Sequence, residues 1–194
     1  MLGSRTFKSL TILLVTMTAG AYVLMLMESA PIRLPARSLA ALSTSGPGPG
    51  RVVAETDVPL RPAKWRNIIV HAYAGEPAEM SRRMHFVIRP GENGGLVAEG
   101  TDLWKRQADG HHVYVPWRDF NADSIGICLI GRFSRTPPTD QQFQLLVDLV
   151  RTLQSTFRIP GDQVYLHSDL DGRSVSPGRA FPARTFTGSL LHAE

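Results

Sequence analysis

Two histidines that lie far apart in the sequence each end a short apolar run. His71 closes the run Asn67-Ile-Ile-Val-His71, and His167 closes the run Val164-Tyr-Leu-His167. A catalytic zinc site takes three protein ligands and keeps one position open, and two histidines at facing strand ends are how such a site begins. The sequence therefore predicts a candidate metal centre on His71 and His167. The alternative is that both are ordinary strand-end histidines without a metal.

The elements that must position these histidines are predicted from apolar periodicity and turn residues. The expected strands are Ile68–Val70, Met84–Arg89, Leu96–Glu99, Ser124–Gly131 and Val164–Leu166. Thr139 to Phe157 is predicted as a helix, because Thr139 and Gln142 form a capping box and apolar residues share one face. A short helix is expected within Phe181–Phe186. The fold class is α/β (α+β): one domain with a mixed central β-sheet flanked by helices and loops gathered at one rim.

The segment from Asp102 to Phe120 has mixed polarity and is predicted as a long surface loop. Loops of that length in compact domains are usually functional. Trp104 and Trp117 are expected at the edge of a groove or in the core rather than as a specific platform for a sugar. His111 and His112 are either solvated loop residues or, for His112, part of a binding groove. His85 lies inside a predicted strand and is expected to be structural.

Composition restricts the possible partners. The chain has 194 residues, a formal net charge of +4 and a pI near 9.6, which favour an anionic partner without specifying one. Its basic residues are scattered rather than interleaved with aromatics, so nucleic acid is not an expected partner. The single cysteine, Cys128, excludes an intramolecular disulfide and is expected in the core.

The N-terminus predicts a membrane anchor. Residues 9–27 carry no charge and are long enough to span a bilayer, after a short cytoplasmic segment at 1–8. Glu28 and Pro31 disfavour cleavage after Ala30, so an uncleaved anchor is preferred over secretion after signal cleavage. Residues 28–62, rich in Pro, Gly, Ser and Ala, are expected as a linker, with a possible edge segment from residue 51. The folded domain, 63–194, is then expected to face the periplasm or the cell-wall side.

Seven segments in a fixed order resemble the zinc-dependent N-acetylmuramoyl-L-alanine amidase type 2 family, which includes the peptidoglycan recognition proteins. The resemblance covers about residues 64–186. The segments are Ile68-Ile-Val-His71, His85-Phe-Val-Ile88, Leu96-Val-Ala-Glu-Gly100, Trp104-Lys-Arg-Gln107 with Gly110-His-His112, Ser124 to Gly131, Pro138-Thr139 with Gln142, and His167 to Pro182. The resemblance implies an amide hydrolase that cleaves between N-acetylmuramic acid and L-alanine. It also implies zinc as cofactor and peptidoglycan or a muropeptide as partner.

The family pattern implies a role for each matching position. The zinc ligands would be His71, His167 and the residue before Pro177, which is Cys or Asp in the family and Ser176 here. A neutral hydroxyl is a poor zinc ligand, so the zinc site is incomplete. Asp169 or Asp171 would have to be re-aimed to replace the third ligand.

The residues around the metal position differ as well. The family tyrosine before the second strand is Met84, which has no donor for the water or the oxyanion. Ser174 keeps a hydroxyl where the family has Thr or Lys, and is the remaining catalytic candidate. His112 and Trp104 are the candidates for substrate binding. Only 13 residues, Ala72 to Met84, occupy a stretch where the family generally has a helix.

These features leave two main functions open, besides a purely structural protein that uses the fold as an interaction surface, and whether the chain is an enzyme stays undecided. The first is a membrane-anchored peptidoglycan-binding protein of the amidase family with a degenerate zinc site and doubtful catalysis, in effect a pseudoenzyme. The alternative is an active zinc-dependent N-acetylmuramoyl-L-alanine amidase that acts in cell-wall turnover. Fold alone does not decide between them.

Overall fold

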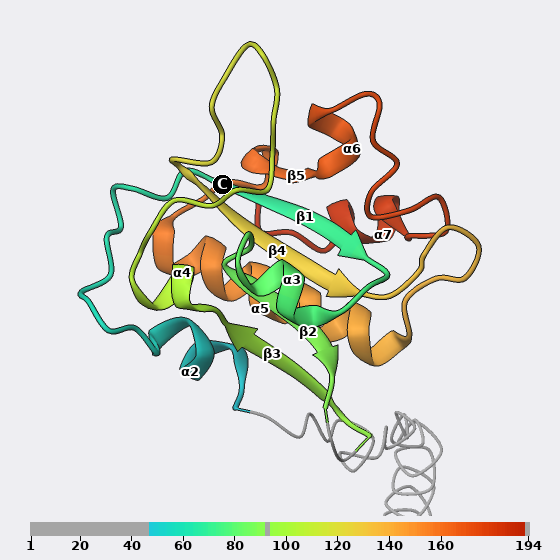
Figure 1. The fold of residues 1–194 in the computed structure, drawn as a ribbon, viewed down its shortest axis with the longest axis horizontal. Coiled ribbons are helices and arrows are strands. Elements are labelled where there is room, and N and C mark those ends of the chain that lie inside the picture. Colours follow the sequence, from blue (N-terminus) through green and yellow to red (C-terminus); the bar gives the residue numbers. More distant parts are fainter. Residues whose placement is uncertain (1–46, 92–93, 193–194) are drawn as a thin grey trace, which may run out of the picture. The chain divides into compact units, whose positions relative to one another are not determined.

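A computed structural model describes residues 47–91 and 94–192 as a five-stranded sheet with helices on both faces (Figure 1). The strands lie in the order β3-β2-β4-β1-β5. Their bounds are β1 Asn67–Tyr73, β2 Phe86–Pro90, β3 Leu96–Gly100, β4 Ser124–Ile130 and β5 Val164–Leu166. All neighbouring pairs are parallel except β2 with β3, which form an antiparallel hairpin. The predicted fold class, a mixed sheet flanked by helices, is confirmed.

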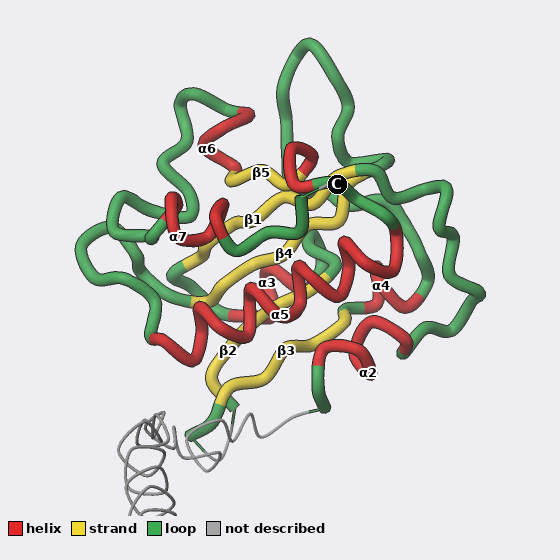
Figure 2. Tube along the Cα trace, turned by 180° about the vertical axis from the view of Figure 1, so that it is seen from behind, coloured by secondary structure: helices red, strands yellow, loops and turns green. Residues whose placement is uncertain are grey.

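The helices are short, with one exception. They are α2 Pro49–Ala54, α3 Pro77–Ser81, α4 Asp102–Lys105, α5 Asp140–Phe157, α6 His167–Leu170 and α7 Ala183–Gly188, with a 3-10 turn at Gly161–Gln163. The long helix α5 begins with the predicted capping box, in which Thr139 Oγ1 accepts from the Gln142 backbone N–H and Gln142 Oε1 accepts from the Thr139 N–H. Figure 2 shows α5 lying across one face of the sheet.

Side chains alternate between the two faces of the sheet, as the period of two requires. Ile68, Val70, Ile125, Ile127 and Leu129 are fully buried in the main core, which α5 and α2 complete. The opposite face receives Ile69 and His71 from β1 and Gly126 and Cys128 from β4, since these residues pair in register. Helix α3 lies on that face, where Met80 packs with Cys128. His71 therefore lies on the face of the sheet opposite the main core, and the candidate metal site belongs to that face.

Three segments differ from the sequence-based expectation. Strand β1 continues two residues beyond His71, because Ala72 and Tyr73 pair with β4. Residues 102–120 are not all surface loop: α4 lies inside them, and Trp104 is fully buried. Residues 49–54 were expected in the linker but form α2, whose Val52 and Val53 are buried in the main core.

The predicted anchor at 9–27 and most of the predicted linker at 28–62 lie outside the described residues. Within residues 47–91 and 94–192, no helix is both long and apolar enough to cross a membrane.

Candidate functional site

Sheet register brings the two predicted metal-ligand histidines together. Val70 of β1 pairs with Leu166 of β5 in a parallel ladder, so the next residues, His71 and His167, follow side by side. Their ring centroids are 4.6 Å apart. His71 is 4% exposed, and its Nε2 has no hydrogen-bond partner among the described residues. The His71 and His167 side chains are thus in contact although almost one hundred residues separate them in the sequence.

The loop after α6 fixes the His167 ring by means of the Ser174 side chain. The Ser174 Oγ lies 3.1 Å from His167 Nδ1 and accepts from the Ser176 backbone N–H. The two loop carboxylates have other partners. Asp169 accepts from the Leu166 N–H at 2.8 Å, and Asp171 accepts from the Arg173 N–H at 3.1 Å. These bonds fix the turn of α6 and the loop after it, and neither carboxylate is released toward His71.

Ser176 reaches the same place from the far end of that loop. Its Oγ accepts a hydrogen bond of 2.9 Å from the backbone N–H of Ala72, the residue that follows His71. The Ser176 carbonyl accepts from the Ser168 N–H. The three positions that the resemblance assigned to zinc, His71, His167 and Ser176, are therefore gathered at one rim of the sheet.

A third histidine, His112, lies against His71 at a ring-centroid distance of 5.3 Å. Its ring is seated over two glycines: an added Cβ would come within 2.5 Å of the ring at Gly126 and within 2.3 Å at Gly110. Asn121 fixes the backbone here, because its Oδ1 accepts from the N–H groups of His112 and Val113. Neither ring nitrogen of His112 has a hydrogen-bond partner of good geometry among the described residues.

Replacing Gly126 by alanine is expected to destabilise the fold by about 1 to 3 kcal/mol, because the new methyl group would overlap the His112 ring. Urea denaturation monitored by circular dichroism measures this. Gly172→Ala is the matched control, since no atom lies within 4 Å of its added Cβ, and its expected change is near zero. Equal stability of Gly126→Ala and wild type would show that His112 is not held over this glycine.

Burial keeps the clustered histidines neutral. Desolvation is the largest cause of the lowered pKa of each histidine. It lowers the pKa of His112 to about 3 and that of His71 well below its ordinary value. His167 is less buried, and desolvation lowers its pKa by a smaller amount, partly offset by Asp171. Neutral imidazoles offer a lone pair, so they can accept a hydrogen bond or bind a metal.

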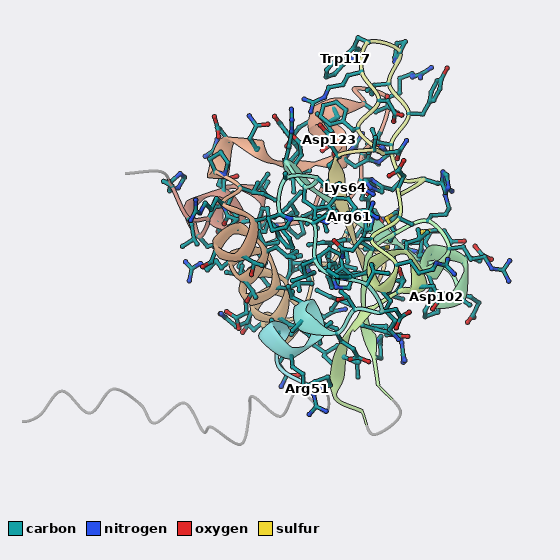
Figure 3. The ribbon with its side chains drawn as sticks, turned by 90° about the vertical axis from the view of Figure 1, so that its left-hand side faces the viewer. Arg51, Arg61, Lys64, Asp102, Trp117 and Asp123 are labelled. Atoms are coloured by element: carbon teal, nitrogen blue, oxygen red, sulfur yellow. The ribbon has the colours of Figure 1, made fainter. Side chains whose placement is uncertain are left out.

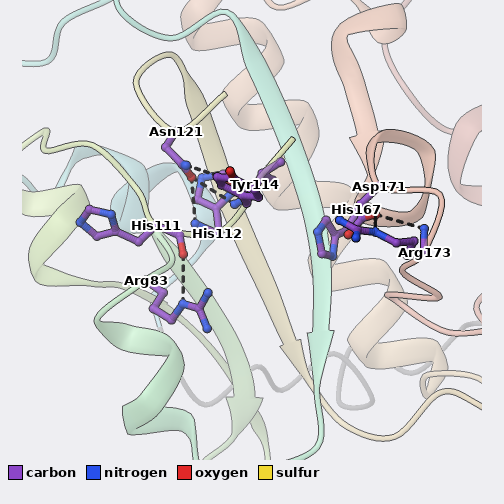
Figure 4. Close-up of a pocket in the computed structure, with 9 residues that line it drawn as sticks. Arg83, His111, His112, Tyr114, Asn121, His167, Asp171 and Arg173 are labelled. Atoms are coloured by element: carbon purple, nitrogen blue, oxygen red, sulfur yellow. Dashed lines mark hydrogen bonds and ion pairs between the residues drawn. The ribbon is translucent and has the colours of Figure 1, made fainter. Parts of the chain in front are cut away.

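Two of these histidines, His112 and His167, line a cavity of about 400 Å³, and the buried His71 lies behind them in contact with both rings (Figure 4). Its lining comes from α6 and the loop after it, from the turn after α3 and from the segment before β4. The lining residues are Arg83, His111, His112, Val113, Tyr114, Asn121, His167, Asp171 and Arg173. The Nε of Arg83 donates to the His111 carbonyl at 3.0 Å, which fixes its guanidinium beside the cavity. Two arginines and one carboxylate give the lining a net positive charge, which suits an anionic ligand.

Comparison with known families identifies the chain. The sequence profile of the family Amidase_2, N-acetylmuramoyl-L-alanine amidase, matches residues 61–179, more than half of the chain. The chain belongs to this amidase family. The match begins near β1 and ends after the Ser176-Pro177-Gly178 turn, so it contains every candidate site residue. A search of curated proteins finds no match.

Solved amidases share the fold. The endolysin amidase LysCS of Clostridium intestinale aligns with a TM-score of 0.52 and 24% identity over 71% of this chain and 91% of its own. AmiD of E. coli, solved with anhydro-N-acetylmuramic acid-L-Ala-D-gamma-Glu-L-Lys, gives 0.56 and 20% over 67% and 59%. AmpDh3 of Pseudomonas aeruginosa, solved with an anhydromuramic pentapeptide, gives 0.54 and 21% over 67% and 61%.

The donor set fits the zinc of the amidase family only in part. His71 and His167 are suitable ligands. The Nε2 of His71 has no hydrogen-bond partner among the described residues and could bind a metal through its lone pair. Ser176 supplies a neutral hydroxyl that is already bonded to the Ala72 N–H. No group of three or more His, Cys, Asp or Glu side chains in residues 47–91 and 94–192 is arranged to hold a metal ion. The described residues therefore do not make a complete three-ligand zinc site.

One sequence-based assignment changes within the amidase fold, and the position of Met84 is now defined. Trp104, proposed for substrate binding, is instead a core residue whose Nε1 donates to the Val53 carbonyl. Met84, at the family tyrosine position, is 5% exposed and packs with Met80 and Cys128 rather than lining the cavity. Both His112 and its neighbour His111 line the cavity, but His112 is buried and His111 is exposed.

Other residues of the site were not found from the sequence. Arg83 and Arg173 line the cavity, Asn121 fixes the His112 backbone and Gly126 seats its ring. Arginines in polar segments carry no spacing signal. Gly126 did carry one, because an isolated glycine inside a strand often marks the close approach of another group.

Proposed function

We propose that this chain is a muropeptide-binding member of the amidase family that does not hydrolyse its ligand. The observation that carries the proposal is Ser176, whose hydroxyl stands at the third-ligand position and is bonded to the backbone of β1. Two imidazoles without an anionic ligand bind zinc weakly compared with a set that includes thiolate or carboxylate. Met84 stands where the family has a tyrosine, and its buried thioether side chain, packed away from the cavity, supplies no phenol to stabilise a developing oxyanion.

Three features support retention of ligand binding. The cavity of about 400 Å³ persists beside the altered metal position. Within residues 47–91 and 94–192, His71 Nε2 and both ring nitrogens of His112 are buried without a hydrogen-bond partner, and such groups are costly unless a ligand or water satisfies them. Arg83 and Arg173 offer charge-assisted hydrogen bonds to carboxylates. AmiD and AmpDh3 were solved with anhydromuramyl peptides, and we propose the same class of ligand here.

The location of this activity is part of the proposal. The uncharged stretch 9–27 would anchor the chain in a membrane, and the linker would give the domain reach into the cell-wall space. A protease-protection assay on intact cells, with an epitope tag at the C-terminus, tests this orientation. Protection of the tag from external protease in cells with a permeabilised outer layer would contradict it.

Titration of the full-length protein with anhydro-N-acetylmuramic acid-L-Ala-D-γ-Glu-L-Lys in a calorimeter tests the function. We expect saturable one-to-one binding, and no cleaved product by mass spectrometry after prolonged incubation with zinc. Arg83→Gln is expected to weaken binding about tenfold, the equivalent of one charge-assisted hydrogen bond. Arg82→Gln is the matched control, because Arg82 is exposed and does not line the cavity.

The outcomes separate the candidate functions. Absence of binding would contradict the proposal. Turnover of the ligand would instead support an active amidase. One observation favours this alternative: Asp171 lines the cavity and lies close enough to His167 for its charge to offset part of the lowering of the His167 pKa by burial. In that case Asp171→Asn should abolish turnover.

A further inference from the structure

Two exposed aromatic side chains stand on the segment from His111 to Phe120, which we call the aromatic loop. Tyr114 is 81% exposed and Trp117 is 64% exposed, the two most exposed large hydrophobic residues in the described part of the chain. In Figures 1 and 3 this loop projects beyond the sheet, with Trp117 near its tip. The tip, Tyr114-Val-Pro-Trp117, carries no charge. Exposed aromatics gathered in this way indicate a contact surface.

The base of the aromatic loop is firmly held. Phe120 is buried, and the Trp117 ring meets it edge-on at 5.3 Å. Arg118 covers the Phe120 ring at 4.3 Å and forms an ion pair of 2.7 Å with Asp123. Val115 and Arg118 form an antiparallel bridge across the loop. A loop with these contacts presents its aromatic rings without a large ordering cost on binding.

The aromatic loop is continuous with the muropeptide cavity, because Tyr114 belongs to both. We propose that Trp117 and Tyr114 stack on the sugar rings of the glycan strand, while the cavity holds the stem peptide. The C–H groups on the face of an N-acetylhexosamine are weakly positive, and they pack on the negative face of an indole or phenol ring. This proposal rests on the proposed function, since it assumes that the peptide occupies the cavity.

The charges of the loop favour a neutral sugar over an anionic membrane surface. Arg118 is neutralised by Asp123, and the Asp119 carboxylate accepts from the Asn121 N–H. The loop therefore offers one paired arginine, whereas attraction to anionic lipids requires several unpaired basic side chains near the surface. Uncharged aromatic rings on a rigid support match the uncharged faces of amino sugars.

Fluorescence quenching provides a selective test. The chain has three tryptophans, of which Trp65 and Trp104 are 2% and 0% exposed, so acrylamide reports almost only on Trp117. Peptide-free glycan strands, added to the full-length protein, are expected to reduce the quenching constant about twofold. Trp117→Ala should bind glycan-linked stem peptide about tenfold more weakly than wild type, in line with loss of an aromatic contact residue. Its affinity for the free stem peptide should be unchanged, and Trp117→Tyr should retain most of the glycan affinity.

Each result of these experiments either supports the inference or overturns it. Binding of the free stem peptide without any protection of Trp117 by glycan would overturn the inference and leave the proposed function standing. Protection of Trp117 by phosphatidylglycerol vesicles but not by glycan would assign the loop to a membrane. Loss of affinity for both ligands in Trp117→Ala would make the residue structural. Failure of wild type to bind stem peptide or glycan would overturn the function and the inference together.

Discussion

Ser176→Cys is expected to convert a chain that binds zinc weakly into one that carries about one zinc ion. The Ser176 Oγ lies beside the residue that follows His71, and His167 is in contact with His71. A sulfur at this position would complete a set of two imidazoles and one thiolate, which zinc prefers strongly to a hydroxyl. We expect zinc affinity to rise by at least about a hundredfold, measured by metal analysis after dialysis against a weak chelator.

Two comparisons make the zinc experiment specific. Val175→Cys adds a thiol one residue earlier, at a side chain that is 60% exposed, and is expected to gain no stoichiometric zinc. The native Cys128 is not a competing ligand, because burial raises the pKa of its thiol to about 12. Adding His71→Ala to Ser176→Cys should abolish the gain. If wild type already holds one zinc ion through purification, Ser176 is not the reason for weak binding and the proposed loss of the site is wrong.

The free energy of unfolding is expected to fall by about 3 kcal/mol between pH 6.5 and pH 4 through His85 alone. His85 is fully buried, its Nδ1 accepts from the Gly126 N–H, and its Nε2 lies 3.1 Å from the Ala108 carbonyl. Desolvation lowers the pKa of His85 to about 4. The unfolded chain takes up a proton near pH 6.5 and the folded chain does not until about pH 4, so acid favours unfolding at about 1.4 kcal/mol per pH unit. Buried His112 contributes in the same direction.

Urea denaturation of wild type and His85→Asn at pH 7.5 and pH 4.5 measures the contribution of His85 to the loss of stability in acid. The asparagine can still accept from the Gly126 N–H but has no proton to gain, so its loss of stability on acidification should be smaller by about 2 to 3 kcal/mol. The difference between the two proteins at pH 7.5 gives the cost of the lost contact to Ala108 and serves as the baseline. Equal loss in both proteins would show that His85 is not held neutral.

Much of the fold could be predicted because its signals are local. Thr139 and Gln142 stand three residues apart at the start of α5, and the apolar runs of β4 and β5 are short and bounded by polar residues. Local signals failed where burial was decided by distant partners. The segment from residue 51 was expected as an edge piece, but nothing around Val52 indicated a helix that packs on α5, and the mixed polarity near Trp104 concealed a fully buried ring.

The sequence by itself determined the five strands and helix α5, the family resemblance and the identity of the residues at the zinc-ligand positions. Only the tertiary structure decided which of those residues meet. The contact of His71 with His167 follows from the register of β1 with β5. The hydrogen bond between Ala72 and Ser176 joins residues 104 positions apart, and the buried position of the His112 ring depends on the space that Gly126 leaves in β4. Such contacts depend on strand order and on side chains packed across the sheet, and no local pattern in a single sequence encodes either of them.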